Sequence, residues 1–237
     1  MVIGVDLGGT KIAAVIATQE GKIITDVNIP TEAQKGQKHV IENIKKAIDT
    51  LIRGQRRKVS KIGIGVPGPI LYDQGIVIEP PNLPGWKKVN LKKILEKEFK
   101  VPVFLDNDAN CAALAEAYFG AGKNAQNFIY ITVSTGIGGG IIINRQLYRG
   151  AIGAAGEFGH MIIDPHGYPC GCGNIGCFEA MASGTAIRRR AGMDAISVEL
   201  AARQGDKKAL KVIDETAHYL AIGIANLVNI FNPEIVV

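Results

Sequence analysis

The stretch VIGVDLGGTKIAAVIATQEGKIITDVNIP, residues 2–30, decides the fold. Its apolar runs are separated by two short turns, so it predicts strand, glycine turn, strand, turn and strand. The order strand, glycine-rich turn, strand returns in FIYITVSTGIGGGIIINRQLY, residues 128–148. The two copies align residues 5–8 with residues 133–136. Because an internal repeat fixes the architecture, the sequence predicts two related α/β lobes that face each other.

Helices and strands alternate in the segments around these two copies. The apolar spacing predicts helices over residues 38–51, 91–99 and about 109–119, and strands over 61–70 and 101–108. We place the boundary between the lobes near residues 105–107, where a buried strand ends in polar residues. The prediction is therefore an N-terminal α/β lobe of residues 1–105 and a larger α/β lobe of residues 106–237.

The composition fits a folded protein whose backbone approaches a ligand closely. Hydrophobic residues make up 47% and charged residues 21%, which excludes a disordered or fibrous chain. Glycine is enriched, with 29 of 237 residues, against a usual share of about 7%. Because the glycines occur in short clusters, we expect several turns at which only a side-chain-free backbone fits.

The net charge of +5 is concentrated in two basic segments, residues 35–61 and 87–100. A basic patch attracts nucleic acid, polyphosphate or another anionic substrate. However, IENIKKAIDTLI (41–52) and VNLKKILEKEF (89–99) both have helical apolar spacing, which places their lysines on solvated outer faces. We therefore expect no nucleic-acid partner.

The first residues have no pattern of a targeting segment. Met1 leads directly into the first strand, without the charged and apolar regions of a signal peptide. No uninterrupted apolar run reaches the length of about 18 residues that a membrane helix needs. We therefore expect a cytoplasmic protein without a membrane partner, in which clustered cysteines bind metal instead of forming disulfides.

Both glycine turns have the composition of a phosphate-binding loop, because glycine amides can approach phosphate oxygens without hindrance. The first turn adds a carboxylate, a hydroxyl and an ammonium group suited to Mg²⁺-linked phosphate, and it consists of Asp6, Gly8, Gly9, Thr10 and Lys11. The second turn contains Thr135, Gly136 and Gly138. The alternative is a pair of tight hairpins in which glycine supplies a positive φ. Neither turn matches a Rossmann or Walker A loop, since each precedes a strand.

A cluster of cysteines and one histidine predicts a metal site. Cys170, Cys172 and Cys177 lie within eight positions, and His160 precedes them by ten residues. Three sulfurs and one imidazole form a complete tetrahedral zinc set, which is typical of a structural site. The alternative is inert reduced cysteines or a redox pair. Cys111 stands alone among helical alanines, and we expect it to pack as a small apolar group.

The sequence Asp106–Asn107–Asp108 ends a predicted buried strand, where α/β proteins gather ligand groups. A carboxylate there could accept the proton of a hydroxyl that attacks a γ-phosphoryl group, and we favour Asp108 for this role. Asn107 would then bind the substrate. The alternative is that Asp106 or Asp108 only caps the helix that follows.

Taken together, these motifs resemble the ROK family (repressors, open reading frames and sugar kinases), and among its members the zinc-containing, ATP-dependent bacterial glucokinases. The resemblance is carried by seven motifs in family order along nearly the whole chain. They are VDLGGTK (5–11), GVPGP (65–69), LDNDANCAALAE (105–116), STGIGGG (134–140), EFGH (157–160), CGCGNIGCFE (170–179) and ASGTAI (182–187).

The resemblance implies an actin-like (ribonuclease H-like) duplicated α/β fold with a sugar site in the cleft between the lobes. It implies transfer of the ATP γ-phosphate to the 6-hydroxyl of glucose, with Mg²⁺ accompanying ATP and zinc in a structural role. By position, Asp108 is similar to the general base, and the sugar ligands would be Gly68, Asn82, Asn107, Asp108, Glu157, His160 and Glu179. The two glycine turns would hold the phosphates of ATP, and the metal ligands would be His160, Cys170, Cys172 and Cys177.

Several alternatives stay open on the sequence. Relatives accept N-acetylglucosamine, N-acetylmannosamine, mannose or fructose, and other members are sugar sensors or repressors that carry an N-terminal DNA-binding module. We expect the protein to form a homodimer or a homotetramer. Family kinases continue past the equivalent of NPEIVV, residues 232–237, so we expect this chain to be truncated at its C-terminus, with an incomplete adenine site.

Overall fold

The computed structural model describes residues 1–53 and 59–237. The chain forms two compact units, each with its own sheet. Unit 1 contains Met1–Ala112 and Arg149–Ala155, and unit 2 contains Ala113–Tyr148 and Gly156–Val237. The lobes predicted from the sequence, residues 1–105 and 106–237, stay a prediction about domains.

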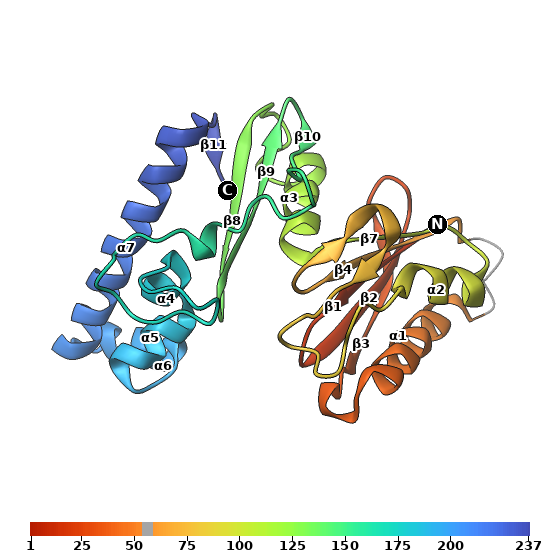
Figure 1. Cartoon of the computed structure of the whole chain (residues 1–237), viewed down its shortest axis with the longest axis horizontal. Coiled ribbons are helices and arrows are strands. Elements are labelled where there is room, and N and C mark those ends of the chain that lie inside the picture. Colours follow the sequence, from red (N-terminus) through yellow and green to blue (C-terminus); the bar gives the residue numbers. More distant parts are fainter. Residues whose placement is uncertain (54–58) are drawn as a thin grey trace. The chain divides into compact units, whose positions relative to one another are not determined.

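Unit 1 is built on a five-stranded sheet with the order β3-β2-β1-β4-β7 (Figure 1). The strands are β1 (Val2–Leu7), β2 (Lys11–Ala17), β3 (Ile23–Pro30), β4 (Lys61–Val66) and β7 (Val103–Asn107). Strands β1, β2 and β3 are antiparallel neighbours, whereas β1, β4 and β7 run parallel. The carboxyl ends of β1, β4 and β7 therefore meet at one edge of the sheet, where ligand groups gather.

Two amphipathic helices, α1 (Gln37–Ile52) and α2 (Leu91–Phe99), cover one face of this sheet. Ile48 of α1 and Phe99 of α2 converge on Ile3 and Ile62, and all four side chains are buried. The predicted helices are thus present with nearly the predicted bounds. Residues 54–58, which belong to the predicted basic segment 35–61, lie outside the described residues.

The connection from β4 to α2 consists of short elements, namely β5 (Ile70–Leu71), the 3₁₀ helix η3 (Tyr72–Gln74) and β6 (Ile76–Val77). The predicted strand over residues 61–70 therefore ends early, at Val66, because Pro67 cannot donate a ladder hydrogen bond. Another 3₁₀ helix, η1 (Ala33–Lys35), lies between β3 and α1.

Unit 2 repeats the strand pattern of unit 1. Its sheet has the order β10-β9-β8-β11, with β8 (Phe128–Val133), β9 (Ile137–Ile143), β10 (Gln146–Leu147) and β11 (Ile235–Val236). Strand β8 pairs antiparallel with β9 and parallel with β11, as β1 pairs antiparallel with β2 and parallel with β4. The predicted duplication of an α/β unit is therefore confirmed.

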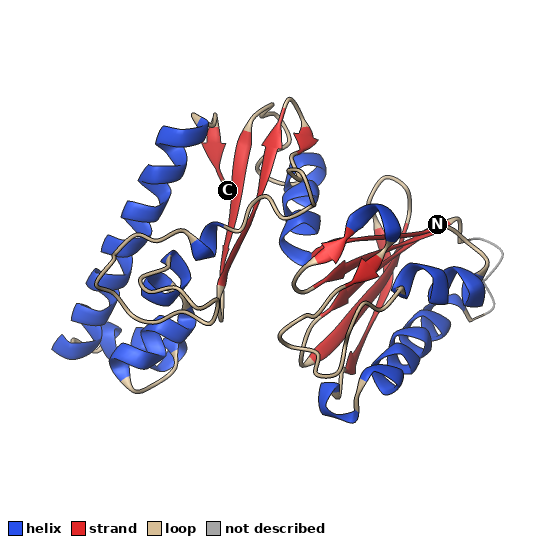
Figure 2. Cartoon of the chain, in the orientation of Figure 1, coloured by secondary structure: helices blue, strands red, loops and turns tan. Residues whose placement is uncertain are grey.

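Helices cover both faces of the sheet in unit 2 (Figure 2). On one face, Ala113 and Ala117 of α3 (Asp108–Phe119) pack on Phe128 and Ile142. On the other side, the 3₁₀ helix η4 (Phe158–His160) and α4 (Phe178–Ala182) contact β9. The helices α5 (Gly184–Ala191), α6 (Ala195–Arg203) and α7 (Lys207–Phe231) pack on α4 and on one another. Phe178 is fully buried on this second face, beside Ile137.

Within the part of the chain that the structure describes, none of the helices combines the length and apolar character needed to cross a bilayer.

Candidate active site

The first glycine turn connects β1 to β2 in unit 1. Asp6 lies next to the end of β1, and the amide of Gly8 donates to the carbonyl of Lys11 at 3.0 Å. Thr31, which follows β3, holds the turn from outside: its amide donates to the Thr10 carbonyl at 2.9 Å and its hydroxyl to the Gly8 carbonyl at 2.6 Å. The turn is therefore fixed by backbone hydrogen bonds and by one neighbouring side chain.

The glycines of the two turns are required by close packing. None of Gly8, Gly9 and Gly136 has a positive φ, so the alternative of hairpins that need a left-handed residue is not supported. A Cβ on Gly9 would lie 2.8 Å from the Cβ of Asn82. A Cβ on Gly136 would collide with the carboxylate of Glu179. Each turn therefore lies against a residue predicted to bind the sugar.

Asp106, Asn107 and Asp108 lie at the junction of β7 and α3, and their side chains make different hydrogen bonds. The side-chain oxygen of Asn107 accepts from the amides of Ala109 at 2.9 Å and Asn110 at 3.3 Å, so Asn107 caps the helix. Asp108 is the first residue of α3, and its Oδ1 accepts from the adjacent Ala109 amide at 2.8 Å. The cap does not depend on Asp108.

The surroundings of Asp108 favour its protonated form. The side chain is accessible to solvent, yet partial burial raises the pKa of its carboxyl, and the charge of Asp6 raises it further. The amide of Ala109 opposes this shift. Burial likewise raises the pKa of Asp6, against the effect of Lys11. A carboxylate with a raised pKa is a better proton acceptor, which is what a general base requires.

Cys111 is a half-buried thiol next to the same carboxylates. Burial, together with Asp106, Asp108 and Asp6, raises the pKa of Cys111 to about 12. A Cβ on Gly65 would lie 3.6 Å from its sulfur. Cys111 therefore packs as a neutral small side chain.

Asp106 anchors the segment Arg149–Ala155, which belongs to unit 1 although its neighbours in sequence belong to unit 2. The Nε and Nη2 atoms of Arg149 donate to one oxygen of Asp106 at 3.0 and 2.7 Å. The other oxygen accepts from Asn107 and Asn110. The Arg149 guanidinium also stacks over the ring of Tyr72, 4.0 Å from its centroid.

The second glycine turn connects β8 to β9 in unit 2. The carboxylate of Glu179, on α4, accepts from the amide of Ile137 at 2.9 Å. The start of α5 holds the opposite side: Gly184 donates to the Ser134 carbonyl at 2.8 Å, and the Thr185 hydroxyl donates to the Thr135 carbonyl at 2.7 Å. Thr135 and Gly136 lie in the turn itself, whereas Gly138 lies in β9.

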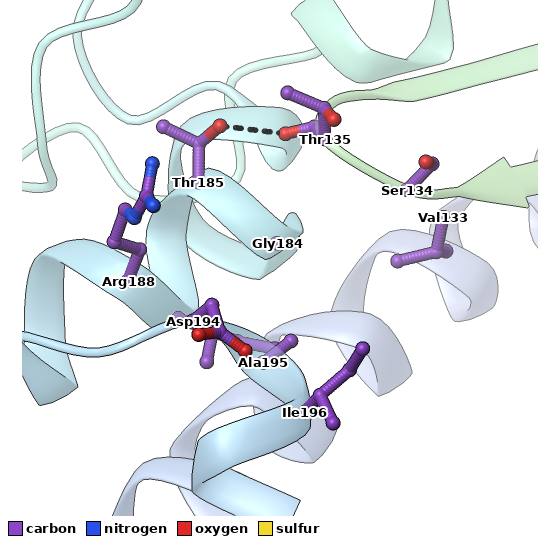
Figure 3. Close-up of a pocket in the computed structure, with 10 residues that line it drawn as sticks. Val133, Ser134, Thr135, Gly184, Thr185, Arg188, Asp194, Ala195 and Ile196 are labelled. Carbon is purple, nitrogen blue, oxygen red and sulfur yellow. Dashed lines mark hydrogen bonds between the residues drawn. The ribbon is translucent and has the colours of Figure 1, made fainter.

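A pocket of about 520 Å³ opens beside this second turn (Figure 3). One wall is the turn and another is α5, and the start of α6 completes it. The lining side chains include Val133, Thr135, Thr185, Arg188, Asp194 and Ile196. Asp194 caps α6 by accepting from the Ser197 amide at 3.0 Å. The pocket thus combines apolar walls with hydroxyl, carboxylate and guanidinium groups next to a phosphate-type turn.

The remaining predicted sugar ligands lie in both units. In unit 1, Gly68 has a φ of 76°, and a Cβ there would lie 3.1 Å from Pro80, two residues before Asn82. In unit 2, Glu157 precedes η4 and His160 ends it, and the His160 amide donates to the Glu157 carbonyl at 3.1 Å. Close backbone packing places this helix, because a Cβ on Gly159 would collide with the carbonyl of Ile137.

The four predicted metal ligands come together. The ligand atoms of His160, Cys170, Cys172 and Cys177 all lie within 4.8 Å of one another. The Nδ1 atom of His160 lies 3.6 Å from the sulfur of Cys170, and the sulfurs of Cys172 and Cys177 are also 3.6 Å apart. This cluster could hold one metal ion through three sulfurs and one imidazole nitrogen, which leaves Nε2 of His160 for another partner.

Sequence reasoning missed Thr31, Arg149 and the pocket residues Arg188 and Asp194. Thr31 and Arg149 act through contacts with residues 23 and 43 positions away, so no local pattern points to them. Arg188 and Asp194 line a pocket that forms only when α5 and α6 pack beside the second turn. The one local signal was at Asp194, whose spacing to Ser197 is typical of a helix cap. That signal predicts a helix start but says nothing of a pocket.

Two α/β units of the same topology, each with a glycine turn after its first strand, define the actin-like class of duplicated nucleotide-binding folds. Within that class the chain belongs to the ROK family, whose model matches residues 2–237.

Relatives in this family include enzymes and regulators. The chain is 41% identical to a glucokinase of Halalkalibacterium halodurans, over 99% of this chain and 78% of that protein. It is 38% identical to a putative xylose repressor of Caldicellulosiruptor sp., over 100% of this chain and 65% of that protein. A solved ROK glucokinase from Streptomyces griseus, in complex with glucose and AMPPNP, superposes with a TM-score of 0.85 at 36% identity, covering 99% of this chain and 81% of that one.

Proposed function

We propose that the protein is a glucokinase, which transfers the γ-phosphate of ATP to the 6-hydroxyl of glucose. The observation that carries the proposal is the state of Asp108. Asn107 caps α3 in its place, and partial burial raises the pKa of the Asp108 carboxyl. Asp108 can therefore accept the proton of the attacking hydroxyl while the helix stays capped.

The sugar would be bound by the polar residues that the sequence predicts for this role. Asn107 would donate through its amide nitrogen, because its oxygen serves the helix. Glu157, Glu179 and the Nε2 atom of His160 would hold further hydroxyls, since carboxylates and imidazole pair well with polyols. Gly68 and Asn82 would line the same site.

The nucleotide would use both glycine turns. Gly8, Gly9, Thr10 and Lys11 of the first turn and Thr135, Gly136 and Gly138 of the second would hold the phosphates. The pocket beside Thr185 and Asp194 would take the nucleoside, because its volume of about 520 Å³ falls within the usual range for small-ligand sites. Mg²⁺ would accompany ATP, and Asp6 is the carboxylate that the first turn offers to this ion.

The cluster of His160, Cys170, Cys172 and Cys177 would hold zinc in a structural role. Three thiolates and one imidazole fill all four positions of a tetrahedral ion, which leaves no open position for catalysis. By fixing His160 through Nδ1, the ion would orient the Nε2 atom toward the sugar. We also propose that the protein assembles as a homodimer or homotetramer, which light scattering would test.

The test is production of glucose 6-phosphate from glucose and Mg-ATP by the wild type and by Asp108→Asn. The substitution should lower kcat by about 10²–10⁴-fold, the usual contribution of a general base, and leave the Kd for glucose unchanged. Asp49→Asn, an exposed change on α1, is the matched control. A wild type that phosphorylates N-acetylglucosamine, N-acetylmannosamine, mannose or fructose instead would correct the substrate, and turnover by Asp108→Asn would overturn the base.

A second candidate is a sugar-responsive regulator, which the 38% identity to a putative xylose repressor favours. A regulator would bind a sugar without phosphorylating it. Sequence-specific DNA binding at physiological salt, together with absence of sugar phosphorylation, would establish this alternative in place of the kinase.

A further inference from the structure

The first glycine turn cannot hold its own shape through side chains. Gly8 and Gly9 have none beyond hydrogen, so their conformation must be imposed by neighbouring groups. Among the residues that the structure describes, the amides of Gly9 and Thr10 make no hydrogen bond to a protein acceptor. Both amides are therefore available to a phosphate, provided that the rest of the turn is fixed.

Thr31 supplies that fixation. It lies directly after β3, and its side chain is fully buried. Its hydroxyl donates to the Gly8 carbonyl at 2.6 Å, and its amide donates to the Thr10 carbonyl at 2.9 Å. One residue therefore holds the carbonyls on both sides of Gly9, the glycine at the centre of the turn.

Thr31 is in turn held by α1. The side-chain amide of Asn43 donates to the carbonyls of Pro30 and Thr31, at 3.2 and 3.3 Å. The backbone turns sharply just after Thr31, where Glu32 has a φ of 53° and pairs with Lys35 and His39. A continuous set of contacts thus leads from α1 through Thr31 to the glycine turn.

We infer that Thr31 is a positioning residue for the phosphate of the nucleotide, acting through the turn of Gly8 and Thr10. This inference rests on the proposed function of that turn. By holding two carbonyls, the threonine preorganises the amides of Gly9 and Thr10 for the phosphate oxygens. A turn that is fixed before binding loses less conformational freedom when the ligand arrives, which strengthens binding.

The test compares Thr31→Val, which keeps the shape but removes the hydroxyl, with Thr31→Ser, which keeps the hydroxyl. Calorimetry with Mg²⁺ and AMPPNP measures nucleotide affinity, and hydrogen exchange of residues 7–11 measures the order of the turn without any activity. Thr31→Val should raise the Kd of the nucleotide about tenfold, the effect of one lost buried hydrogen bond, and speed exchange in the turn. The Kd for glucose should stay unchanged, and Thr31→Ser should remain within about twofold of the wild type.

The control variant Ile48→Val distinguishes a positioning role of Thr31 from a general effect on stability. It shortens a fully buried side chain of α1 that packs beside Ile3 and Ile62. It should lower Tm without changing nucleotide affinity. An equal loss of affinity in Ile48→Val, or wild-type affinity and exchange in Thr31→Val, would overturn the inference. If Thr31→Val fails to fold, Asn43→Ala takes its place in the test. Faster hydrogen exchange in residues 7–11 of that variant would support the fixation of the turn through Thr31, and unchanged exchange would refute it.

The outcomes also separate this inference from the proposed kinase. A wild type that binds Mg-AMPPNP but phosphorylates none of the sugars tested would remove the kinase, and the comparison of Thr31→Val with the wild type would still decide the role of Thr31. A wild type that binds no Mg-AMPPNP would remove both.

Discussion

Arg149 and Asp106, 43 residues apart in sequence, form a two-donor ion pair at the end of β7. The Nε and Nη2 atoms of Arg149 lie 3.0 and 2.7 Å from the same oxygen of Asp106. The Asp106 side chain is only 9% exposed, so its charge depends on this partner. The pair ties the segment Arg149–Ala155 to the strand that leads directly into Asp108.

Arg149→Met should destabilise unit 1, because it leaves the buried charge of Asp106 unpaired. Since Arg149 is itself 27% exposed, we expect a loss of about 2 kcal/mol, below the ~3–5 kcal/mol of a fully buried pair. The measurement is urea unfolding. Arg203→Met, which breaks the exposed pair with Glu199, should change stability by no more than about 0.5 kcal/mol.

The double variant Asp106→Asn with Arg149→Met should lose less stability than the two single changes added together, because it removes the unpaired charge. Equal effects of Arg149→Met and Arg203→Met would show that the ion pair at β7 contributes no more than a surface pair.

The raised pKa of Asp108 predicts how activity and stability respond to pH. If the ionised carboxylate is the base, kcat/KM should fall on the acid side at a pH above 3.8, the ordinary value for this group. Because the folded state favours the proton, the contribution of Asp108 to stability is greatest below that ordinary pKa. It is lost as the pH rises through the folded pKa.

Asp108→Asn should therefore have a higher Tm than the wild type near about pH 7, and the difference should shrink toward about pH 4. Thermal unfolding at both pH values measures it. A difference of the opposite sign, or one that grows as the pH falls, would contradict the raised pKa.

Removal of the metal ligands should separate metal content from fold. Cys170→Ser should lower bound zinc from about one ion per chain to near zero, because three ligands hold the ion poorly. Chelation of the wild type should lower its Tm, because the free energy of metal binding stabilises the folded state. Cys111→Ala is the matched control, since Cys111 belongs to unit 1 and lies outside the cluster. A metal-free wild type with an unchanged Tm would refute a structural zinc.

Gly136→Ala should disturb the second turn and the proposed sugar site together. A Cβ at this position would collide with the Glu179 carboxylate, which accepts from the Ile137 amide at 2.9 Å. We expect the KM values for both sugar and nucleotide to rise, by about tenfold if one charge-assisted hydrogen bond is lost. Gly171→Ala, where a Cβ meets nothing within 4 Å, should leave both values unchanged. Unchanged KM values in Gly136→Ala would show that the Glu179 side chain can move aside without affecting substrate binding.

The sequence by itself determined the elements and the repeat, because these depend on short-range periodicity. The helix predicted over residues 91–99 is present as Leu91–Phe99, since its apolar side chains recur at helical spacing on one face. The duplication followed from two glycine turns with the same flanking strands. The four residues of the metal cluster were predicted as a group because three of them share one short loop.

Only the tertiary structure decided how the candidate site is supported. It placed the helix cap on Asn107, which leaves Asp108 available, although three adjacent polar residues could each have served. It also explained the turn glycines by close approach to Asn82 and Glu179. The supports from Thr31 and Arg149 depend on contacts 23 and 43 residues apart in sequence. Such contacts exist only after the chain has folded, so no local pattern encodes them.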